Sequence, residues 1–456
     1  MNRLFVENSI GEIIQKYVRK ELSPKEVAIA TLQNIAEYDP QYFAWMSVVD
    51  EGWPERVQTE AETFGINPNH LLEYIPVGVK DIYNTRDFPT QMGSPLWKGF
   101  TPGNDARAVY HLKRHGATVA GKTVTAEFAV HALDKTLNPY DITKTPGTSS
   151  SGSAVAVSLG MVPLTTGSQT AGSIVRPASF CGIYGMKPSF GLIPRTGTLK
   201  TTDSLDTLGF FTLHAQDMRR GFDALRVYGE NYPISHTALN DSVRQQKPAK
   251  KPWRVALVKT HTWEYAPQYA RDSLFSFAEK LKEAGMSVIE ADLPSVTGSA
   301  HEIHTTIYNK SLSYYFDKEH KHAEFVSPIM NELIASGTAI DKKAFAQALA
   351  EQTECIYTMD GFFKNFDIIL SLSTAGEAPP REITELPDPA LMWTLTHLPV
   401  VSAPVFTSPN GLPFGLQIVA RKYNDYLLLG FIESLLAISL IPSVAGYCTK
   451  MNKNSN

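Results

Sequence analysis

Residues 144–191, KTPGTSSSGSAVAVSLGMVPLTTGSQTAGSIVRPASFCGIYGMKPSFG, form the stretch from which the fold is best interpreted. Serine and glycine are dense in this stretch, but valine, leucine, isoleucine and phenylalanine are interleaved with them throughout. A flexible linker rich in serine and glycine lacks such apolar residues, so the pattern favours a folded segment. The pattern predicts a short small-residue helix over 154–160 and a buried strand over 161–167.

Two serines in this stretch are candidates for chemistry. Ser149 belongs to a triple serine ahead of the predicted helix, and Ser173 follows Ala171 and Gly172 after the predicted strand. A serine hydroxyl attacks a carbonyl only when a base takes its proton and fixed donors receive the developing oxyanion. Backbone N–H groups of a glycine turn are suitable donors, so the layout indicates acyl transfer.

Lys80 is the candidate base. A lysine followed by aspartate is usually a solvated surface pair. Here the flanking residues Ile75, Val77, Val79 and Ile82 favour burial within an apolar strand over 72–82. A buried lysine is costly when charged, so its pKa falls and its neutral amine can act as a base near neutral pH.

Residues 116–123, GATVAGKT, satisfy the phosphate-loop pattern of nucleotide-binding proteins. That loop requires a strand before its first glycine and a helix after its lysine. In this chain a predicted helix over 106–115 comes first, and 117–120 has the composition of a strand. The context therefore argues against nucleotide binding.

Composition places the chain among ordinary globular enzymes. Its 456 residues contain 43% hydrophobic, 10% aromatic and 19% charged residues, with a net charge of −4. No basic surface is implied, so we do not expect direct nucleic-acid binding. The three cysteines are widely spaced, which fits a reducing compartment. The first residues lack a continuous apolar segment and no stretch is long enough to span a membrane, so we expect a cytoplasmic protein.

Outside the central stretch, the sequence predicts mainly supporting structure. A capping box at Ser9 and a proline after Ser23 predict two N-terminal helices within about 9–40. A polar linker is expected over 247–252, a β-α-β unit over 253–293 and a mostly helical region over 296–365. The histidines of the last region, His301, His304, His320 and His322, lack zinc-ligand spacing and are expected at the surface.

The central stretch resembles the signature of the amidase signature family. The family pattern GGSSGGS, then GTDxGGSIR, then CGxxGxKP is similar to GTSSSGS at 147–153, GSQTAGSI at 167–174 and CGIYGMKP at 181–188. GVKD at 78–81, GKT with EFA within 121–129, SLDTLG at 204–209 and GLPFGLQ at 411–417 match further family elements. The ordered motifs cover the chain from about residue 9 to about residue 440.

This resemblance implies the fold and its organisation. The family has an α/β fold with a central mixed, mostly parallel twisted sheet of many strands and helices on both faces. It implies a single domain over 1–456, with a signature core at about 70–230 and a variable helical region at about 296–365. Neither a cofactor nor a metal ion is expected, and a homodimer is left open.

The resemblance also implies roles for the candidate residues. Lys80 is expected to be the base of a Ser-Ser-Lys triad, Ser149 the proton relay after a cis peptide bond from Thr148, and Ser173 the nucleophile. The oxyanion hole is expected from four backbone N–H groups, those of Thr170, Ala171, Gly172 and Ser173. The element at 204–206 is expected to support the site.

Several positions depart from the family pattern. Thr148, Ser151 and Ala171 replace glycines, and Gln169 replaces an aspartate, which makes the turns bulkier and predicts an altered pocket. Arg176 stands three residues after Ser173, whereas many members have arginine two residues after the nucleophile. This form, with Gln169, resembles malonamidase and its relatives, so we expect both residues to bind substrate. A structural ion pair of Arg176 with a nearby acid is the open alternative.

The function implied is hydrolysis of an amide C–N bond in a small, carboxylate-bearing amide through a covalent acyl-enzyme. One alternative is an ammonia-supplying glutaminase subunit of a tRNA amidotransferase, against which Gln169 and Arg176 count. A second is a biosynthetic acyl transferase that uses the same acyl-enzyme. A non-catalytic scaffold is disfavoured, because Lys80, Ser149 and Ser173 are all present.

Overall fold

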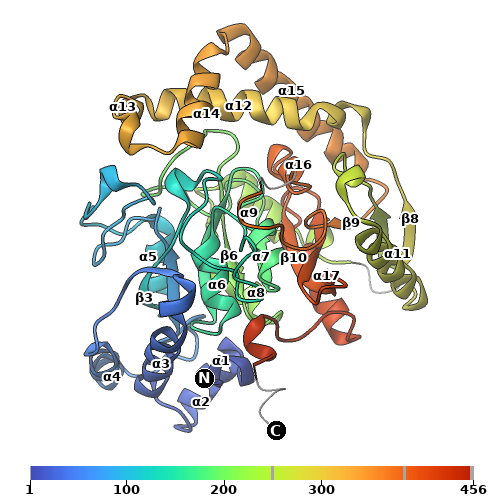
Figure 1. The fold of residues 1–456 in the computed structure, drawn as a ribbon. Helices are drawn as coiled ribbons and strands as arrows, with labels where there is room; N and C mark the ends of the chain where they lie inside the picture. Colours follow the sequence, from blue (N-terminus) through green and yellow to red (C-terminus); the bar gives the residue numbers. More distant parts are fainter. Residues whose placement is uncertain (1, 248–250, 384–386, 452–456) are drawn as a thin grey trace.

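One 11-stranded sheet runs through the molecule in a computed structural model that describes residues 2–247, 251–383 and 387–451. The strand order is β1-β3-β2-β4-β6-β5-β10-β11-β9-β7-β8, and helices surround the sheet (Figure 1). The strands are β1 (Trp45–Val48), β2 (Pro76–Lys80), β3 (Thr118–Thr123), β4 (Leu164–Gln169), β5 (Tyr184–Lys187), β6 (Thr207–Thr212), β7 (Arg254–Leu257), β8 (Ser287–Glu290), β9 (Ile368–Leu372), β10 (Val400–Thr407) and β11 (Pro413–Ala420).

The α/β class and the mixed sheet are confirmed, but the expectation of a mostly parallel sheet is wrong. Four of the ten strand pairings are parallel, namely β2–β3, β2–β4, β7–β8 and β7–β9. The other six are antiparallel: five involve β6, β5, β10 and β11, which form an antiparallel centre between the two parallel parts, and the sixth joins β1 to β3 at one edge of the sheet. Mixed sheets of this kind are common among large sheets.

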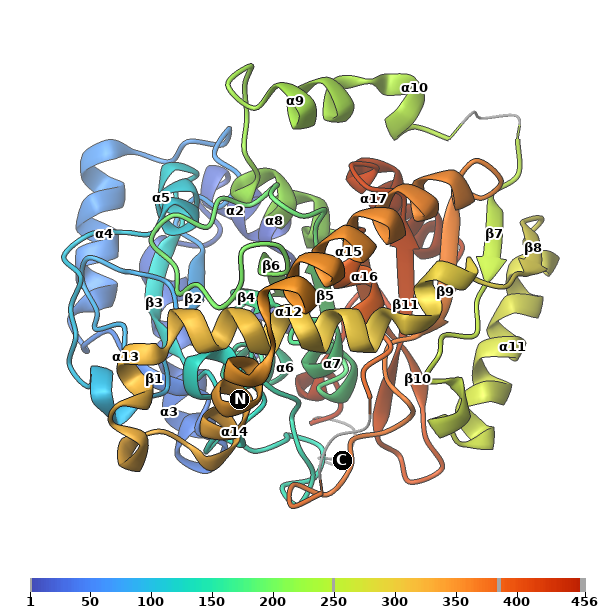
Figure 2. The ribbon, with the colours of Figure 1, turned by 90° about the horizontal axis from the view of Figure 1, so that it is seen from above.

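Helices cover both faces of this sheet (Figure 2). The helices α6 and α7 contact each other and the central strands on one face, while α5, α8 and α17 form the opposite layer. The helices are α1 (Leu4–Glu7), α2 (Ile10–Val18), α3 (Pro24–Tyr42), α4 (Trp53–Phe64), α5 (Arg107–Arg114), α6 (Ser151–Ser158), α7 (Val175–Phe180), α8 (Asp217–Leu225), α9 (Pro233–Asn240), α10 (Ser242–Gln245), α11 (Gln268–Glu283), α12 (Ala300–Tyr315), α13 (Asp317–His320), α14 (Pro328–Ala339), α15 (Lys342–Phe362), α16 (Leu391–Leu395) and α17 (Asp425–Ala437).

A further helical layer lies across one end of the strands. It consists of α12, α13, α14 and α15, which follow one another in the chain and pack together at the top of Figure 1. This layer corresponds to the helical region expected over 296–365, and we call it the helical cap. The single-domain organisation over 1–456 stays a prediction, although strands from both halves of the chain share one sheet.

Local signals predicted the N-terminal helices well. Ser9 and Ser23 both form capping boxes, with Glu12 and Glu26 respectively, at the starts of α2 and α3. The polar linker expected over 247–252 falls partly outside the described residues. No helix of the described chain has the length and apolar character required to cross a membrane. Cys181, Cys355 and Cys448 are free and buried.

The segment that matches the phosphate-loop pattern, residues 116–123, stabilises the fold through its lysine. Its lysine, Lys122, lies on β3 and forms a fully buried ion pair with Asp81, with 3.0 Å between Nζ and Oδ1. Lys122 Nζ also donates to the backbone carbonyls of Tyr83 and Pro89 and to the hydroxyl of Thr90. The ammonium group therefore holds the chain that leaves β2 immediately after Lys80.

We expect Lys122→Met to lower the free energy of unfolding by about 3–5 kcal/mol, because it leaves the Asp81 carboxylate buried without its counter-charge. The double variant Lys122→Met/Asp81→Asn should lose less free energy of unfolding than the sum of the losses in the two single variants. Lys113→Met, which removes a half-exposed partner of Asp105, is the control and should cost at most about 1 kcal/mol. Urea unfolding measures all four; strict additivity would contradict the buried pair.

Candidate active site

Lys80 is the last residue of β2 and is completely buried. Its Nζ lies 2.9 Å from each of three serine Oγ atoms, those of Ser149, Ser150 and Ser168. Strands β2 and β4 are parallel neighbours, so Lys80 and Ser168, near their carboxyl ends, lie at the same end of the sheet. In open α/β sheets, ligands bind beyond the carboxyl ends of the strands.

Burial lowers the pKa of Lys80 to about 7. Desolvation is the main cause, and the carboxylates of Asp134 and Asp206 oppose it by favouring the charged amine. A substantial fraction of Lys80 is therefore a neutral amine at neutral pH, with a lone pair able to accept a hydroxyl proton. The expectation that Lys80 is buried is confirmed, and the direction of its pKa agrees with the expected one.

Ser149 precedes α6 and is fully buried beside Lys80. The peptide bond from Thr148 to Ser149 is cis, as the resemblance implied. The neighbouring Ser150 accepts a hydrogen bond from the backbone N–H of Ser168 and donates one to its carbonyl, at 3.3 and 3.2 Å. Ser150 and Ser168 thus fix the hydroxyl cluster around the amine.

Ser173 lies on the turn from β4 to α7, which we call the nucleophile turn (residues 170–174). The exposed fraction is 7% for Ser173 and 0% for both Ser149 and Lys80. The candidate nucleophile is therefore the member of the three that solvent reaches. The backbone N–H groups of Gly172 and Ser173 donate to no backbone carbonyl of the described residues.

Gln169 holds the nucleophile turn from inside the protein. Its Oε1 accepts hydrogen bonds from the backbone N–H groups of Ile174 and Val175, at 2.9 and 3.0 Å. Its Nε2 donates to the hydroxyl of Thr394, and the side chain is fully buried. This placement departs from the substrate-binding role expected for Gln169, because its amide is used by the chain itself.

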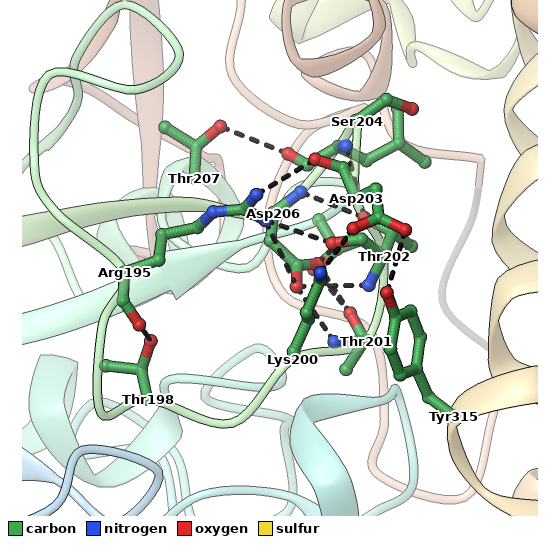
Figure 3. Close-up of polar contacts among 12 residues, drawn as sticks. Arg195, Thr198, Lys200, Thr201, Thr202, Asp203, Ser204, Asp206, Thr207 and Tyr315 are labelled. Atoms are coloured by element: carbon green, nitrogen blue, oxygen red, sulfur yellow. Dashed lines mark hydrogen bonds and ion pairs between the residues drawn. The ribbon is translucent and has the colours of Figure 1, made fainter.

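Asp206 also contacts this turn, through Thr170, and it gathers the polar groups of residues 201–206 around its carboxylate (Figure 3). It accepts hydrogen bonds from the hydroxyls of Thr170, Thr201 and Thr202 and from the backbone N–H groups of the last two. In Figure 3 the adjacent Asp203 points toward Lys200 and Tyr315. The supporting role expected for the element at 204–206 agrees with this arrangement.

Arg176, in the first turn of α7, is paired with an acid of the chain. Its Nη2 lies 3.5 Å from Oδ2 of Asp388, and both side chains are largely buried. The Asp388 carboxylate also packs directly on the nucleophile turn, since a Cβ at Gly172 would lie 1.4 Å from its Oδ2. The structure therefore contains the ion pair that was left open as the alternative for Arg176.

Two residues near the site were missed or misplaced by sequence reasoning. His304 was expected at the surface, but it is 3% exposed, and its Nε2 donates to the Thr170 carbonyl at 2.7 Å. Its spacing from Ile307, Tyr308 and Leu312 on the buried face of α12 was the available signal. Asp388 lies in a region that matches the family weakly, and no sequence signal marked it.

The described residues contain no cluster of three or more histidine, cysteine, aspartate or glutamate side chains placed to hold a metal ion. The polar groups at the site are instead hydroxyls, amides and one amine, with carboxylates at its margin. This donor set is suited to moving protons and stabilising an oxyanion.

A mixed α/β sheet with a buried lysine against serine hydroxyls at the carboxyl ends of parallel strands is the framework of a hydrolytic enzyme. The sequence profile of the amidase family matches residues 26–429, and the chain belongs to this family. It is accordingly an amidase, an enzyme that acts on amide C–N bonds.

Comparisons with individual proteins extend this result. One subunit of the glutamyl-tRNA(Gln) amidotransferase of Thermus thermophilus is 36% identical over 463 residues, with 92% of this chain and 94% of that protein covered. The peptide amidase of Stenotrophomonas maltophilia has a TM-score of 0.80 at 23% identity, covering 97% of this chain and 99% of the other. The glutamyl-tRNA(Gln) amidotransferase subunit of Thermotoga maritima gives 0.77 at 24% identity, covering 94% of both chains.

At these identities the two solved structures establish a shared fold and nothing finer. The named relatives do not include malonamidase, so the closer resemblance to malonamidase is not confirmed and stays a prediction.

We expect kcat/KM for amide hydrolysis to rise with pH through about 7, because only the deprotonated Lys80 amine can accept a proton. Asp134→Asn should move this rise to lower pH, because it removes the first of the carboxylates that favour the charged amine. A pH–rate profile of both proteins tests this. A rate that is independent of pH around neutrality would contradict a titrating Lys80.

Proposed function

We propose that the chain hydrolyses the amide bond of a small amide with Ser173 as nucleophile, Ser149 as proton relay and Lys80 as base. The observation that carries this proposal is the 2.9 Å contact between the buried Lys80 Nζ and Ser149 Oγ. A neutral amine in this position can take the Ser149 proton while Ser149 takes the proton of Ser173. Such general base catalysis typically raises the reaction rate by about 10²–10⁴-fold.

The reaction then proceeds in two stages. Ser173 Oγ bonds to the amide carbon, and the carbonyl oxygen becomes an oxyanion. The proton held by Lys80 returns through Ser149 to the leaving nitrogen, the C–N bond breaks, and the amine departs as ammonia or a substituted amine. Water then attacks the acyl carbon and gives a proton to the same base. The bond to Ser173 Oγ breaks, the proton passes through Ser149 to Ser173 Oγ, and the carboxylic acid leaves.

The backbone N–H groups of the nucleophile turn are the proposed oxyanion hole, as the sequence predicted for Thr170, Ala171, Gly172 and Ser173. The N–H groups of Gly172 and Ser173 support this role, because no backbone carbonyl in the described part of the chain accepts from them. Loss of one oxyanion donor costs about 2.7–4 kcal/mol in well-studied cases. Gln169 and Asp206 are proposed to position this turn. For Gln169 this role takes the place of the expected contact with substrate.

The substrate that we propose carries a carboxylate. Arg176 and Asp388 lie beside a pocket also lined by Phe180, Thr374, Glu377 and Pro379. A substrate carboxylate would replace Asp388 as the partner of the Arg176 guanidinium, which favours bidentate carboxylate recognition. The alternative is that the ion pair is permanent and only orders the loop that carries Asp388.

A second candidate function is favoured by the relatives. The Thermus thermophilus protein and the 29% identical protein of Alkaliphilus metalliredigens are both the same subunit of a glutamyl-tRNA(Gln) amidotransferase. By analogy, this chain would release ammonia from glutamine inside an assembly with partner subunits. Glutamine is itself a small amide that carries a carboxylate, so the same triad and the same Arg176 proposal serve both candidates.

The first test is intact-protein mass spectrometry after incubation with a fluorophosphonate. We expect one adduct on the wild type, none on Ser173→Ala, and an unchanged adduct on Ser273→Ala, which alters a serine of α11 as the matched control. Ammonia release is then measured for glutamine, other acidic amides and neutral amides.

Hydrolysis of several acidic amides by the isolated chain would favour the independent amidase, whereas activity confined to glutamine would favour the glutaminase subunit. Formation of a new amide or ester in place of the free acid, when an ordinary primary amine or an alcohol is added with the acyl donor, would favour the acyl transferase. No adduct on the folded wild type would overturn the proposed nucleophile.

Two variants separate the roles proposed for Arg176. Arg176→Met should raise KM for acidic amides by about 10-fold or more, the loss expected for a hydrogen bond to a charged group, and leave neutral amides unchanged. Asp388→Asn should lower KM for acidic amides, because it weakens the competitor for the guanidinium. Steady-state kinetics on matched acidic and neutral amides measure both; equal losses on the two substrate classes would remove the carboxylate proposal.

A further inference from the structure

The helical cap lies across the end of the sheet at which the active site is found, and polar contacts connect it to the signature core (Figures 1 and 2). Tyr315 of α12 donates to Asp203, and Gln352 of α15 donates to the carbonyl of Ser204. His304 of α12 makes the contact nearest the chemistry, because it reaches the nucleophile turn itself. No catalytic role was expected for any residue of this cap.

The hydrogen bond of His304 has a defined direction. Its acceptor is a backbone carbonyl oxygen, which cannot donate, so Nε2 of His304 must carry a proton. The side chain is 3% exposed, and burial lowers the pKa of His304 to about 4. The imidazole is therefore neutral at neutral pH, with its Nε2–H directed at Thr170 O over 2.7 Å.

This carbonyl belongs to the same peptide unit as the N–H of Ala171. A trans peptide unit is planar, so its C=O and N–H point in opposite directions. A donor that holds the Thr170 carbonyl on one side consequently fixes the direction of the Ala171 N–H on the other. Hydrogen bonding to the carbonyl also polarises the unit and strengthens its N–H as a donor.

The next two peptide units of the turn are held in the same way. The Ala171 carbonyl accepts a hydrogen bond from the hydroxyl of Thr394 at 2.7 Å, which fixes the N–H of Gly172. The Gly172 carbonyl accepts from the backbone N–H of Arg176 at 2.9 Å, which fixes the N–H of Ser173. Each backbone N–H from Ala171 to Ser173 thus belongs to a peptide unit whose carbonyl oxygen accepts a hydrogen bond from a defined donor.

We propose that His304 is a positioning residue of the oxyanion hole, which orients the Ala171 N–H toward the developing oxyanion through the Thr170 carbonyl. This proposal rests on the proposed function, in which the nucleophile turn receives the oxyanion. It assigns to the helical cap a part in stabilising the transition state, exerted through the backbone of the nucleophile turn. Thr394 has the corresponding place one peptide unit further along the turn.

The test compares three variants of His304 by steady-state kinetics and thermal unfolding. His304→Leu removes the donor, and His304→Gln retains an N–H donor with similar reach. We expect kcat to fall about 10-fold or more in His304→Leu with KM nearly unchanged, because the interaction acts on the transition state. His304→Gln should restore most of this loss, and His304→Asn, with a shorter reach, should restore less.

Tyr315→Phe is the matched control, because it removes another polar contact of α12 that does not touch the nucleophile turn. Its kcat should equal that of the wild type. A merely structural role for His304 would instead lower the midpoint of thermal unfolding without a selective loss of kcat, and the glutamine variant would give no rescue. Wild-type kcat in a folded His304→Leu protein would overturn the proposal.

If His304→Leu does not fold, Thr394→Val provides the same test at the adjacent peptide unit and should lower kcat with little change in KM. Unchanged kcat in Thr394→Val would then overturn the positioning of the turn through its carbonyls. Failure of the proposed function is distinguishable from these outcomes, because it would show as an absent Ser173 adduct on the wild type.

Discussion

The burial of one amine, that of Lys80, is the constraint on which the rest of the site depends. A buried ammonium group is costly, and the chain reduces this cost by letting the pKa of Lys80 fall rather than by pairing it with a carboxylate. Three serine hydroxyls surround the amine at 2.9 Å and come from two separate segments. This geometry requires β2 and β4 to be adjacent and parallel. The nearby Lys122 solves the same problem in the opposite way, with a buried carboxylate partner.

Sequence reasoning succeeded where chemistry and local structure are encoded in one short segment. The signature stretch specifies α6, β4 and the nucleophile turn together, and flanking apolar residues indicated the burial of Lys80. The capping boxes of α2 and α3 are similarly local. The direction of strand pairing is not local, so the antiparallel centre of the sheet was not anticipated. Strand β10 was not predicted either. It contains Pro404, and its register with β11 shifts between Ala403 and Phe406.

The residues that depart from the family pattern are accommodated by contacts that a single sequence cannot show. Ser151, where the family has glycine, donates a hydrogen bond from its hydroxyl to Asp134, a carboxylate that acts electrostatically on Lys80. Gln169, the residue before the nucleophile turn, donates a hydrogen bond to Thr394, which is more than two hundred residues away in the chain. His304 and Asp388 reach the same turn from the later half of the chain. The motif therefore marked the candidate reacting groups, while the groups that hold them could be found only in three dimensions.

The position of β5 in the sheet has a consequence for the order in which the enzyme is made. Strand β5 ends the signature segment, and its free edge is covered only by β10, which pairs through Val400, Val401 and Ser402. An uncovered strand edge is a template for pairing with other chains. During synthesis Ser173 emerges long before β10, α12 and Thr394, so a ribosome-bound chain contains the nucleophile turn before the groups that hold it. Strand β5 keeps an unpaired edge until residues 400–402 have been made, and partly folded chains with such edges are prone to aggregate.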